Sequence, residues 1–410
     1  NNEFTRDEIL SMRAKEMLDA AEQLPASQPE VGRIHKYIAL AYAAKIKLYQ
    51  AYQQDEITHA VTSINKELLR EVVSLCDQVT ASNRYGLLDD FQGLDLVTNE
   101  NGKESVFAIQ YSMNDGTESA GRINWSNLLN SPGGDSPYGG DGFFLPSQDL
   151  INAYQTDANG LPDFNYQSKS DYSWAVLNNG VYTLQNTTPN VDPRLDFVVG
   201  RPTITWKTYP DKPCGGWVRD KDTYGYNCAK RFWVSPESSD MFNGWPWGAS
   251  QLNWQIIRYA DILLWKAEAL IELNEGNGLE TARDLINQIR NRARNSAYVK
   301  DFNDHSKYAA NYLVNPYPAD VWNQDYARQA LRWETRLEKA LEGERFFDLV
   351  RWGIVETTMN NYITAESDNR IYYANAHFTG GKDEYYPVPN NQYGFSGGKY
   401  VQNPGYAPFN

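Results

Sequence analysis

The chain has 410 residues, and its 38 lysines and arginines against 52 aspartates and glutamates give a formal net charge of −14. This acidic balance, without a basic stretch, argues against nucleic-acid binding, which needs Lys and Arg to neutralise phosphates. Hydrophobic residues make up 41% of the sequence, but no window approaches the roughly 18 consecutive apolar residues of a membrane-spanning helix. We therefore expect a globular chain with a large buried core.

Residues 1–84 predict a set of helices. Apolar residues recur at helical spacing up to Leu24, where Leu24-Pro25 ends the first helix. Residues 34–52 predict a second helix, whose alanines suit close contact with a neighbouring helix. A third predicted helix carries an apolar stripe of seven positions, namely Ile57, Val61, Ile64, Leu68, Val72, Cys76 and Val79. Such helices, joined by short turns, are typical of tetratricopeptide-like antiparallel pairs, although the consensus residues of that repeat are absent.

The texture of the sequence changes between residues 85 and 254. Gly, Pro, Asn and Ser interrupt short apolar segments, which predicts irregular structure with brief strands. Eight of the 12 tryptophans fall between Trp125 and Trp254. Three of these stand in MFNGWPWGASQLNW, residues 241–254, where two glycines and a proline interrupt any regular helix or central strand. These rings either fill a core or face a ligand.

Helices return between residues 255 and 355. The segment QIIRYADILLWKAEALIEL has one apolar face and ends at NEGNG, and further helices are predicted over 279–294 and about 321–342. Residues 356–410, rich in Tyr, Asn, Gly and Pro, are expected to wrap along the surface. We therefore predict one mostly α domain over 1–410, in which a tetratricopeptide-like helical-pair scaffold (1–84 and 255–355) carries a large irregular, short-stranded insertion (85–254).

The three cysteines bear on the compartment. Cys76 lies on the apolar face of a predicted helix, which indicates a buried thiol. Cys214 and Cys228 flank a segment with the composition of a loop or hairpin, so they are a candidate disulfide, worth roughly 3 kcal/mol in the chain-entropy model. Such a bridge would indicate an oxidising compartment. Two unpaired thiols are the alternative.

Motifs for catalysis, cofactors and metals are absent. The sequence has no G-x-S-x-G elbow, P-loop or H-E-x-x-H. DANGLPD, residues 157–163, lacks the glycine and glutamate spacing of a calcium-binding EF-hand loop, so it predicts a turn. His35, His59, His305 and His377 form no recognisable ligand pair. We therefore predict no catalytic residue, no metal site and no cofactor.

Four ordered blocks carry a specific pattern. Arg-Tyr-Ala-Asp at 258–261 is followed by Ala-Glu-Ala at 267–269, and then by Ile-Asn-x-Ile-Arg-x-Arg-Ala at 286–293. A third block has Glu334, Glu338, Glu342, Gly343, Arg345, Asp348, Leu349, Arg351, Trp352 and Gly353. The segments EYYPVP and QNPGY stand near the end. Together these blocks resemble the SusD/RagB family of outer-membrane nutrient-binding lipoproteins of Bacteroidota, with Arg336 one place from the usual arginine of the third block.

The resemblance implies a non-catalytic binding protein at the cell surface. Such a protein would hold oligosaccharides or polysaccharides, or peptides in some relatives, and deliver them to a TonB-dependent transporter of the SusC type. In the family, membrane attachment comes through an N-terminal lipid anchor. We expect this anchor, and the stretch that normally precedes the match to residues 5–52, to be missing from this chain. That stretch supplies part of the ligand site in family members.

The third block also predicts a charged scaffold. Glu334, Glu338 and Glu342 are four residues apart and share one helical stripe. The candidate partners for bidentate pairing are Arg290, Arg292, Arg345 and Arg351. We expect this network to lock helices together, so the residues that carry the resemblance are not the binding site.

The aromatic residues of the insertion are the candidate ligand site. Sugars present C–H faces that stack on Trp and Tyr rings, and hydroxyls that pair with Asn, Asp and Arg, so aromatic rings in polar loops suit them. The candidates are Trp174, Trp206, Trp217, Arg219, Tyr224, Asp240, Asn243, Trp245 and Trp247. The alternative for each ring is a place in the core, which is expected for Trp254, Trp265, Trp333 and Trp352.

Two other classes of function remain open at this level. A glycoside hydrolase on a helical scaffold would need two carboxylates facing a cleft. A protein-binding helical scaffold would instead shield its aromatic loops. The acidic charge of the chain mildly disfavours strongly anionic polysaccharides, but the sequence does not identify the ligand.

Overall fold

The computed structural model describes residues 4–118, 121–125, 129–178, 181–184, 189–207, 217–245 and 247–409, without the side chains of 176–178 and 181–184. The helices of eight residues or more are α1 (Arg6–Gln23), α2 (Lys36–Ala51), α3 (Lys66–Ala81), α7 (Tyr259–Leu273), α8 (Gly278–Asn295), α9 (Gln324–Glu338) and α11 (Val355–Ser367). The short helices are α4 (Gln148–Ala153), α5 (Arg194–Val198), α6 (Lys221–Tyr224), α10 (Arg345–Arg351) and α12 (Asn390–Phe395). The predicted mostly helical class is confirmed.

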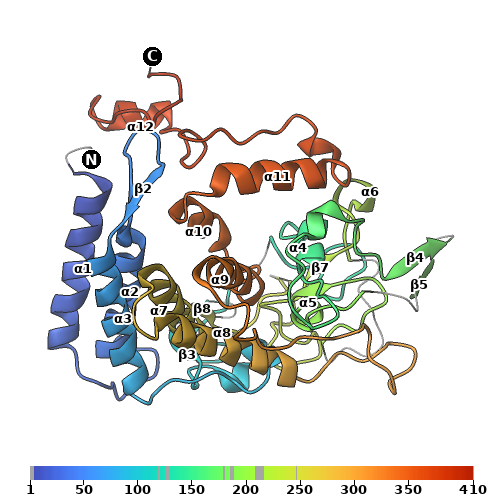
Figure 1. The fold of residues 1–410 in the computed structure, drawn as a ribbon. Helices are drawn as coiled ribbons and strands as arrows, with labels where there is room; N and C mark the ends of the chain where they lie inside the picture. Colours follow the sequence, from blue (N-terminus) through green and yellow to red (C-terminus); the bar gives the residue numbers. More distant parts are fainter. Residues whose placement is uncertain are drawn as a thin grey trace.

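Six helices form the frame of the molecule. Figure 1 shows α1, α2, α3, α7 and α8 side by side in that order, and α9 packs against α7 and α8. Small residues let the helices approach closely, because Ala39, Ala43 and Ala44 of α2 are buried against the neighbouring helices. The chain therefore leaves the frame after α3, forms the insertion and returns to the frame at α7. The tetratricopeptide-like arrangement of these helices in pairs stays a prediction.

The third helix is shorter than its apolar stripe predicts. It begins at Lys66, where the side chain of Asn65 accepts hydrogen bonds from the backbone N–H groups of the first turn. Strand β2 (Val61–Ile64) instead forms a hairpin with β1 (Tyr52–Gln54). Ile57 lies in the hairpin turn with 70% of its surface exposed, since Asp55 caps that turn. Local turn and capping chemistry therefore overrides the helical spacing of Ile57, Val61 and Ile64.

Where the structure describes the insertion, its elements are short. The strands there and at its return to the frame are β3 (Ser105–Ile109), β4 (Ala175–Asn178), β5 (Val181–Leu184), β6 (Val199–Gly200), β7 (Cys228–Ala229) and β8 (Trp254–Arg258). They pair as β3–β8, β4–β5 and β6–β7, each pair antiparallel. Residues 254–258 are thus a strand, although the helical segment was expected to begin at about 255. Trp254 at the strand's start is half-buried, and its ring centroid lies 4.7 Å from that of Phe232 in a tilted contact, so its expected place in the core is corrected.

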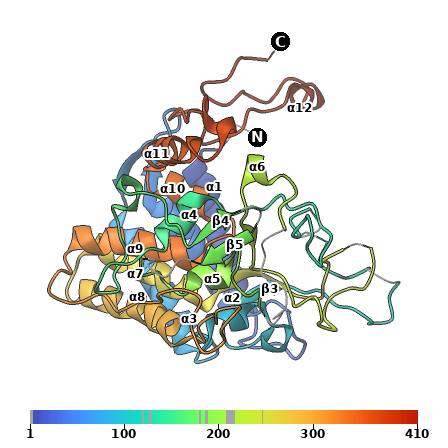
Figure 2. The same ribbon diagram turned by 90° about the vertical axis from the view of Figure 1, so that its right-hand side faces the viewer.

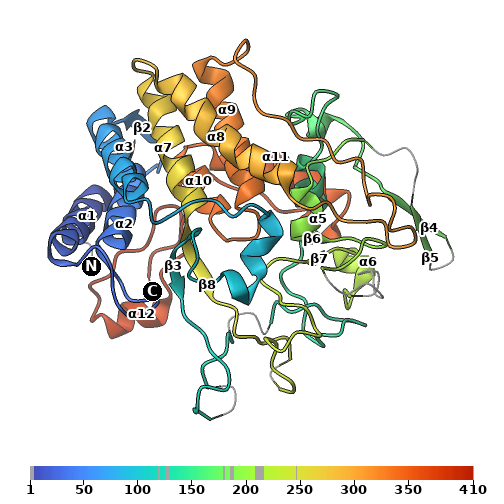
Figure 3. The ribbon, with the colours of Figure 1, turned by 90° about the horizontal axis from the view of Figure 1, so that it is seen from below.

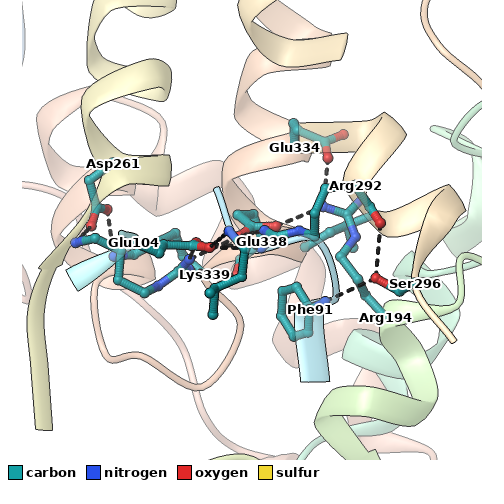
Figure 4. A network of polar contacts seen from close by, with 12 residues as sticks. Phe91, Glu104, Arg194, Asp261, Arg292, Ser296, Glu334, Glu338 and Lys339 are labelled. Atoms are coloured by element: carbon teal, nitrogen blue, oxygen red, sulfur yellow. Dashed lines mark hydrogen bonds and ion pairs between the residues drawn. The ribbon is translucent and has the colours of Figure 1, made fainter. Parts of the chain in front are cut away.

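Glu338 lies at the centre of a buried ion-pair network (Figure 4). Its carboxylate pairs with Arg258 at 3.0 Å, with Arg194 at 3.2 Å and with Arg292. These arginines come from β8, α5 and α8, respectively. Arg258 and Arg292 also pair with Glu104, which precedes β3. The network therefore ties the base of the insertion to the helical frame.

The glutamate stripe has some of the predicted partners and some unexpected ones. Glu334 pairs with Arg290 at 3.0 Å, as predicted, and with Arg194 at 2.6 Å. Glu342, beyond the end of α9, pairs with Arg258, Arg231 and Lys339. The predicted roles of Arg345 and Arg351 are wrong. Arg351 pairs instead with Glu268 and Asp348, and the described ion pairs of the three glutamates do not include Arg345.

The other tryptophans expected in the core differ in burial. Trp265 and Trp352 are buried, as predicted, whereas Trp333 is only half-buried. Residues after Arg351 run along the outside of the molecule, but they include α11 as well as extended chain (Figure 1).

Cys76 is buried, and Cys214 lies outside the described residues, so its pairing with Cys228 stays a prediction. In the described part of the chain, no helix is long and apolar enough to cross a membrane.

Candidate functional site

The aromatic stretch 241–254 is a hairpin-like loop that extends from the β3–β8 pair. The last residues in register are Ile109 and Trp254. Beyond them, the N–H of Tyr111 donates to Oδ1 of Asn253 at 2.7 Å. Phe242 N–H donates to the carbonyl of Ala249 at 2.8 Å, which closes the loop on itself. Figure 3 shows the chain leaving β3 and entering β8 through loops that project away from the helices.

Glycine conformations expose the tip of this loop. Gly244 and Gly248 have φ of 125° and 75°, values that side chains rarely allow. Between them, Trp245 and Trp247 have 65% and 47% of their surfaces exposed. A Cβ on Gly248 would lie 2.8 Å from Cβ of Ser131, so only glycine fits there. The loop with the paired base therefore presents two indole rings to solvent.

A polar groove of about 840 Å³ lies beside the tip, and we call it the Trp247 groove. This volume is within the usual range for small-molecule sites. Its lining comes from residues of the segments 112–118, 121–123, 137–138, 236–239, 241–244 and 247–248, which Figure 2 shows among the loops that extend beyond the helical frame. Trp245 is next to this lining in the sequence but is not part of it. Hydroxyl, amide and charged groups of the lining belong to Ser112, Asn114, Thr117, Glu118, Arg122, Ser238, Ser239 and Asn243. Aromatic and polar groups therefore meet at one surface.

The loop 131–142 packs against Trp247 of the groove lining. Gly142 N–H donates to Ser131 O at 2.8 Å and closes this loop. A Cβ on Gly139 would lie 3.8 Å from Cγ of Trp247, so the indole packs against the loop. Arg219 contacts the same loop, pairing with Asp141 at 2.9 Å. Arg219 does not line the Trp247 groove, and its guanidinium is already engaged.

Two of the predicted ligand residues are core residues. Trp206 and Trp217 are buried with Trp233 around the ring of Tyr138. Trp206 Nε1 donates to the Tyr138 hydroxyl at 3.0 Å, and that hydroxyl donates to Val234 O at 2.7 Å. The rings of Trp206 and Trp217 are therefore packed inside the protein, and the indole N–H of Trp206 is paired there. The prediction that Trp206 and Trp217 contact a ligand is corrected to a supporting role beneath the loops.

One other predicted residue, Trp174, lines a separate pocket of about 470 Å³, which we call the Trp174 pocket. Its lining also includes Tyr172, Tyr226, Asn227 and Arg370. Tyr224, at the end of α6, does not line this pocket, and its exposed ring lies 6.0 Å from the ring of Tyr372. The predicted ligand residues therefore do not form one site.

Asn243 and Asp240 have different surroundings. Asn243 lines the Trp247 groove. Asp240 faces an adjoining pocket of about 670 Å³, and its carboxylate accepts hydrogen bonds from Ser238 and Gln251. Asp240 therefore braces the two sides of the aromatic loop.

Sequence reasoning missed several residues at these surfaces. Trp125 is 45% exposed, and the preceding Asn124 donates to Ser250 O at 2.8 Å, so this indole lies on a strand-like segment beside the loop. The polar residues 112–122 of the groove carry no motif. Asn227 and Arg370 of the Trp174 pocket are 143 positions apart and likewise carry no signal. Only the local excess of aromatic residues could have indicated Trp125.

Two carboxyl groups near the aromatic loop have shifted pKa values. Hydrogen bonds from Ser112 and Thr117, with the charge of Arg122, lower the pKa of Asp115. Burial raises the pKa of Glu100 to about 7. Glu100 accepts a hydrogen bond from Asn253 N–H at 2.6 Å at the base of the loop, away from the groove lining. Among the described residues, no cluster of three or more His, Cys, Asp and Glu could hold a metal ion.

Comparisons with known proteins identify relatives of the fold. The model of the SusD family matches residues 103–406. A SusD homolog from Bacteroides thetaiotaomicron is similar over 98% of this chain and 70% of its own, with 17% identity and a TM-score of 0.65. A SusD-like protein from Bacteroides fragilis matches 87% of this chain and 64% of its own, with 23% identity and a TM-score of 0.56. No curated protein sequence matches the chain.

One similar structure contains a ligand. Surface glycan-binding protein A from Bacteroides thetaiotaomicron, in complex with laminarihexaose, matches 98% of this chain and 71% of its own, with 16% identity and a TM-score of 0.56. This chain therefore spans between 64% and 71% of the lengths of these three structures.

Proposed function

The chain belongs to the SusD family, and on that premise we propose that it binds oligosaccharides or polysaccharides without cleaving them. The ligand lies along the Trp247 groove, with Trp245 and Trp247 stacking on sugar rings. Asn243 and the serine and threonine hydroxyls of the lining pair with sugar hydroxyls. The complex of a similar structure with laminarihexaose supports this class of ligand.

The observation that carries the proposal is the pair of exposed indoles at the tip of a closed loop. Exposed tryptophan is costly in water, so two such rings beside one polar groove indicate a surface built for contact. The backbone hydrogen bond from Phe242 to Ala249 closes the loop below these rings.

Membership of the SusD family also supports a proposal for the location and the partner of the protein. We propose that the protein is lipid-anchored at the outer membrane, faces the cell exterior and passes its ligand to a TonB-dependent transporter of the SusC type. A co-purification of the protein with its transporter from native membranes tests this partnership, and a protein that purifies without any such partner contradicts it.

Electrophoresis through gels containing neutral polysaccharides tests the binding function. Laminarin, starch, xylan and mannan form a first panel, and the wild-type protein should be retarded by at least one. The double variant Trp245→Ala/Trp247→Ala should lose most of that retardation. Tyr386→Ala, which removes a ring that is 91% exposed outside the groove, is the matched control and should behave as wild type.

Two further readouts separate the alternatives. New reducing ends after incubation with the retained polysaccharide would indicate a hydrolase instead of a binding protein. Retardation by none of the polysaccharides, with binding to a peptide library, would favour the peptide-binding class. Unchanged retardation of the double variant would place the ligand away from the Trp247 groove.

A further inference from the structure

The Trp174 pocket has a fixed aromatic wall. Nε1 of Trp174 donates to the carbonyl of Pro202 at 3.0 Å. The guanidinium of Arg201 lies 4.6 Å from the Trp174 ring centroid, and Asp196 holds it through two hydrogen bonds of 2.8 Å. Tyr172 stacks on the same indole at 6.0 Å. The ring therefore keeps one orientation without a ligand.

Asn227 supplies an unused polar group in the same lining. The residue is 5% exposed, and its Oδ1 atom has no hydrogen-bond partner among the residues that the structure describes. A buried acceptor left without a donor costs about 1–3 kcal/mol. A ligand hydroxyl bound in the Trp174 pocket would supply that donor. Asn227 directly precedes β7, so its backbone is anchored in the β6–β7 pair.

Gly225 brings the C-terminal segment to the pocket. Its φ is 76°, and a Cβ there would lie 2.3 Å from Nη2 of Arg370. The missing side chain lets Arg370 approach, while Arg370 Nη1 donates to Asn369 O at 2.6 Å. Asn369 in turn donates to Asp171 at 3.1 Å. The pocket is thus assembled from the insertion and the segment after α11.

The charges of the lining select the class of ligand. Asp171 and Asp222 face Lys221 and Arg370, so the formal charges of the lining cancel. A free anion or cation would gain little net attraction there. An uncharged molecule with hydroxyl donors and one apolar face suits the indole and the amide together. A sugar ring has these properties.

We propose that the Trp174 pocket is a second glycan site, which binds one neutral sugar residue independently of the Trp247 groove. The proposal rests on the proposed glycan-binding function. Trp174 stacks on the sugar, and Oδ1 of Asn227 accepts a hydrogen bond from one of its hydroxyls. The two sites share no lining residue. A long polysaccharide that engages both gains affinity through multivalency.

The test is calorimetric titration of the full chain with a short oligosaccharide, prepared from whichever polysaccharide of the panel retards it. Wild type should bind two molecules per chain. Asn227→Leu removes the acceptor but keeps a similar volume, and should weaken one of the two sites about fivefold or more, the effect of one hydrogen bond. Trp174→Phe should weaken the same site. Asn227→Leu should also raise the melting temperature of the free protein, since no buried acceptor stays unpaired.

Asn291→Leu is the matched control. Oδ1 of Asn291 on α8 also lacks a partner among the described residues, but Asn291 lines neither glycan site. This variant should stabilise the free protein without changing either binding event. A loss of binding in both asparagine variants would show a general effect of the substitution and would overturn the assignment of Asn227.

The outcomes distinguish the two proposals. One molecule bound per chain, lost in Trp245→Ala/Trp247→Ala and unaffected by Asn227→Leu and Trp174→Phe, would overturn the second site alone. Binding that survives the double variant and is lost in Asn227→Leu would support the Trp174 pocket and contradict the Trp247 groove. A wild-type chain that no polysaccharide of the panel retards would overturn both.

Discussion

Oε1 of Glu338 accepts a hydrogen bond from Nη1 of Arg258 at 3.0 Å, and both side chains are buried. Arg194 and Arg292 pair with the same carboxylate. Burial alone would raise the pKa of Glu338, but the three arginines outweigh burial and lower it to about 2. The carboxylate is therefore charged inside the protein and depends on its partners.

Glu338→Gln should destabilise the fold strongly. Removal of one member of a buried ion pair costs about 3–5 kcal/mol, because the partners remain buried without compensation. Urea denaturation measures the free energy of unfolding. Glu16→Gln, which breaks an exposed pair with Arg13, is the matched control and should change it little. Similar effects of the two substitutions would contradict a central role for Glu338.

Trp206→Ala and Trp245→Ala should differ in their effect on stability, because Trp206 is buried and Trp245 is exposed. Trp206 is buried against Tyr138 and Trp217, so truncation should cost about 3–5 kcal/mol of stability. Trp245 lies at an exposed tip, so its truncation should leave the free energy of unfolding within about 0.5 kcal/mol of wild type. Denaturation curves of the two variants test this contrast, which an equal loss of stability would refute.

Glu366→Gln should change how stability depends on pH. Glu366 is buried and accepts a hydrogen bond from Asp149 N–H. Burial raises its pKa to about 6, above the unfolded value of about 4.5. The folded state therefore favours the protonated acid, and this stabilisation is complete below about pH 4.5 and is lost as the pH rises through about 6.

The Gln side chain stays neutral at every pH, so the variant does not have to bury a charge when the pH rises. It should be more stable than wild type by about 1–2 kcal/mol at about pH 8, and the difference should vanish near pH 4. Glu100 also has a raised pKa, but it makes the same contribution to the pH dependence of stability in both proteins, so it does not affect the difference between them. Thermal unfolding at several pH values provides the measurement. A constant difference across the range would show that Glu366 does not titrate as expected.

Gly248→Ala should damage the tip of the aromatic loop. Its positive φ costs an alanine roughly 1–2 kcal/mol, and the new Cβ would also meet Ser131. We expect a corresponding loss of stability and weaker polysaccharide retardation, since Trp247 must move. Gly276→Ala has a positive φ of 54° but no atom within 4 Å of the added Cβ, far from the groove in sequence. That control should lose stability without losing retardation.

The helical frame was predictable because its signals are local. The four-residue spacing of Glu334, Glu338 and Glu342 indicated a charged stripe, and Arg290 and Arg292 proved to be partners. Arg194 was not predictable, because it lies 140 residues from Glu334 in an insertion without periodicity. Local patterns identify helices, but they do not report which distant side chain completes a buried pair.

The candidate site was less predictable for a similar reason. Trp206 and Trp245 both stand in polar, irregular sequence. Their different burial depends on the hydroxyl of Tyr138, which is 68 residues from Trp206 and accepts its indole N–H. The glycines around Trp245 did indicate an interruption, but whether an interrupted loop turns inward depends on contacts that only the folded chain creates.

The Glu338 network also constrains the time course of folding. Arg292 and Glu104 are separated by 188 residues, and Arg194 and Glu338 by 144. A ribosome adding about 5–20 residues per second needs roughly 10–50 s to travel from Glu104 to Glu338. Until Glu338 is synthesised, the network lacks its central carboxylate. High contact order of this kind predicts slow maturation, in which water leaves the charged centre only after Glu338 joins its partners.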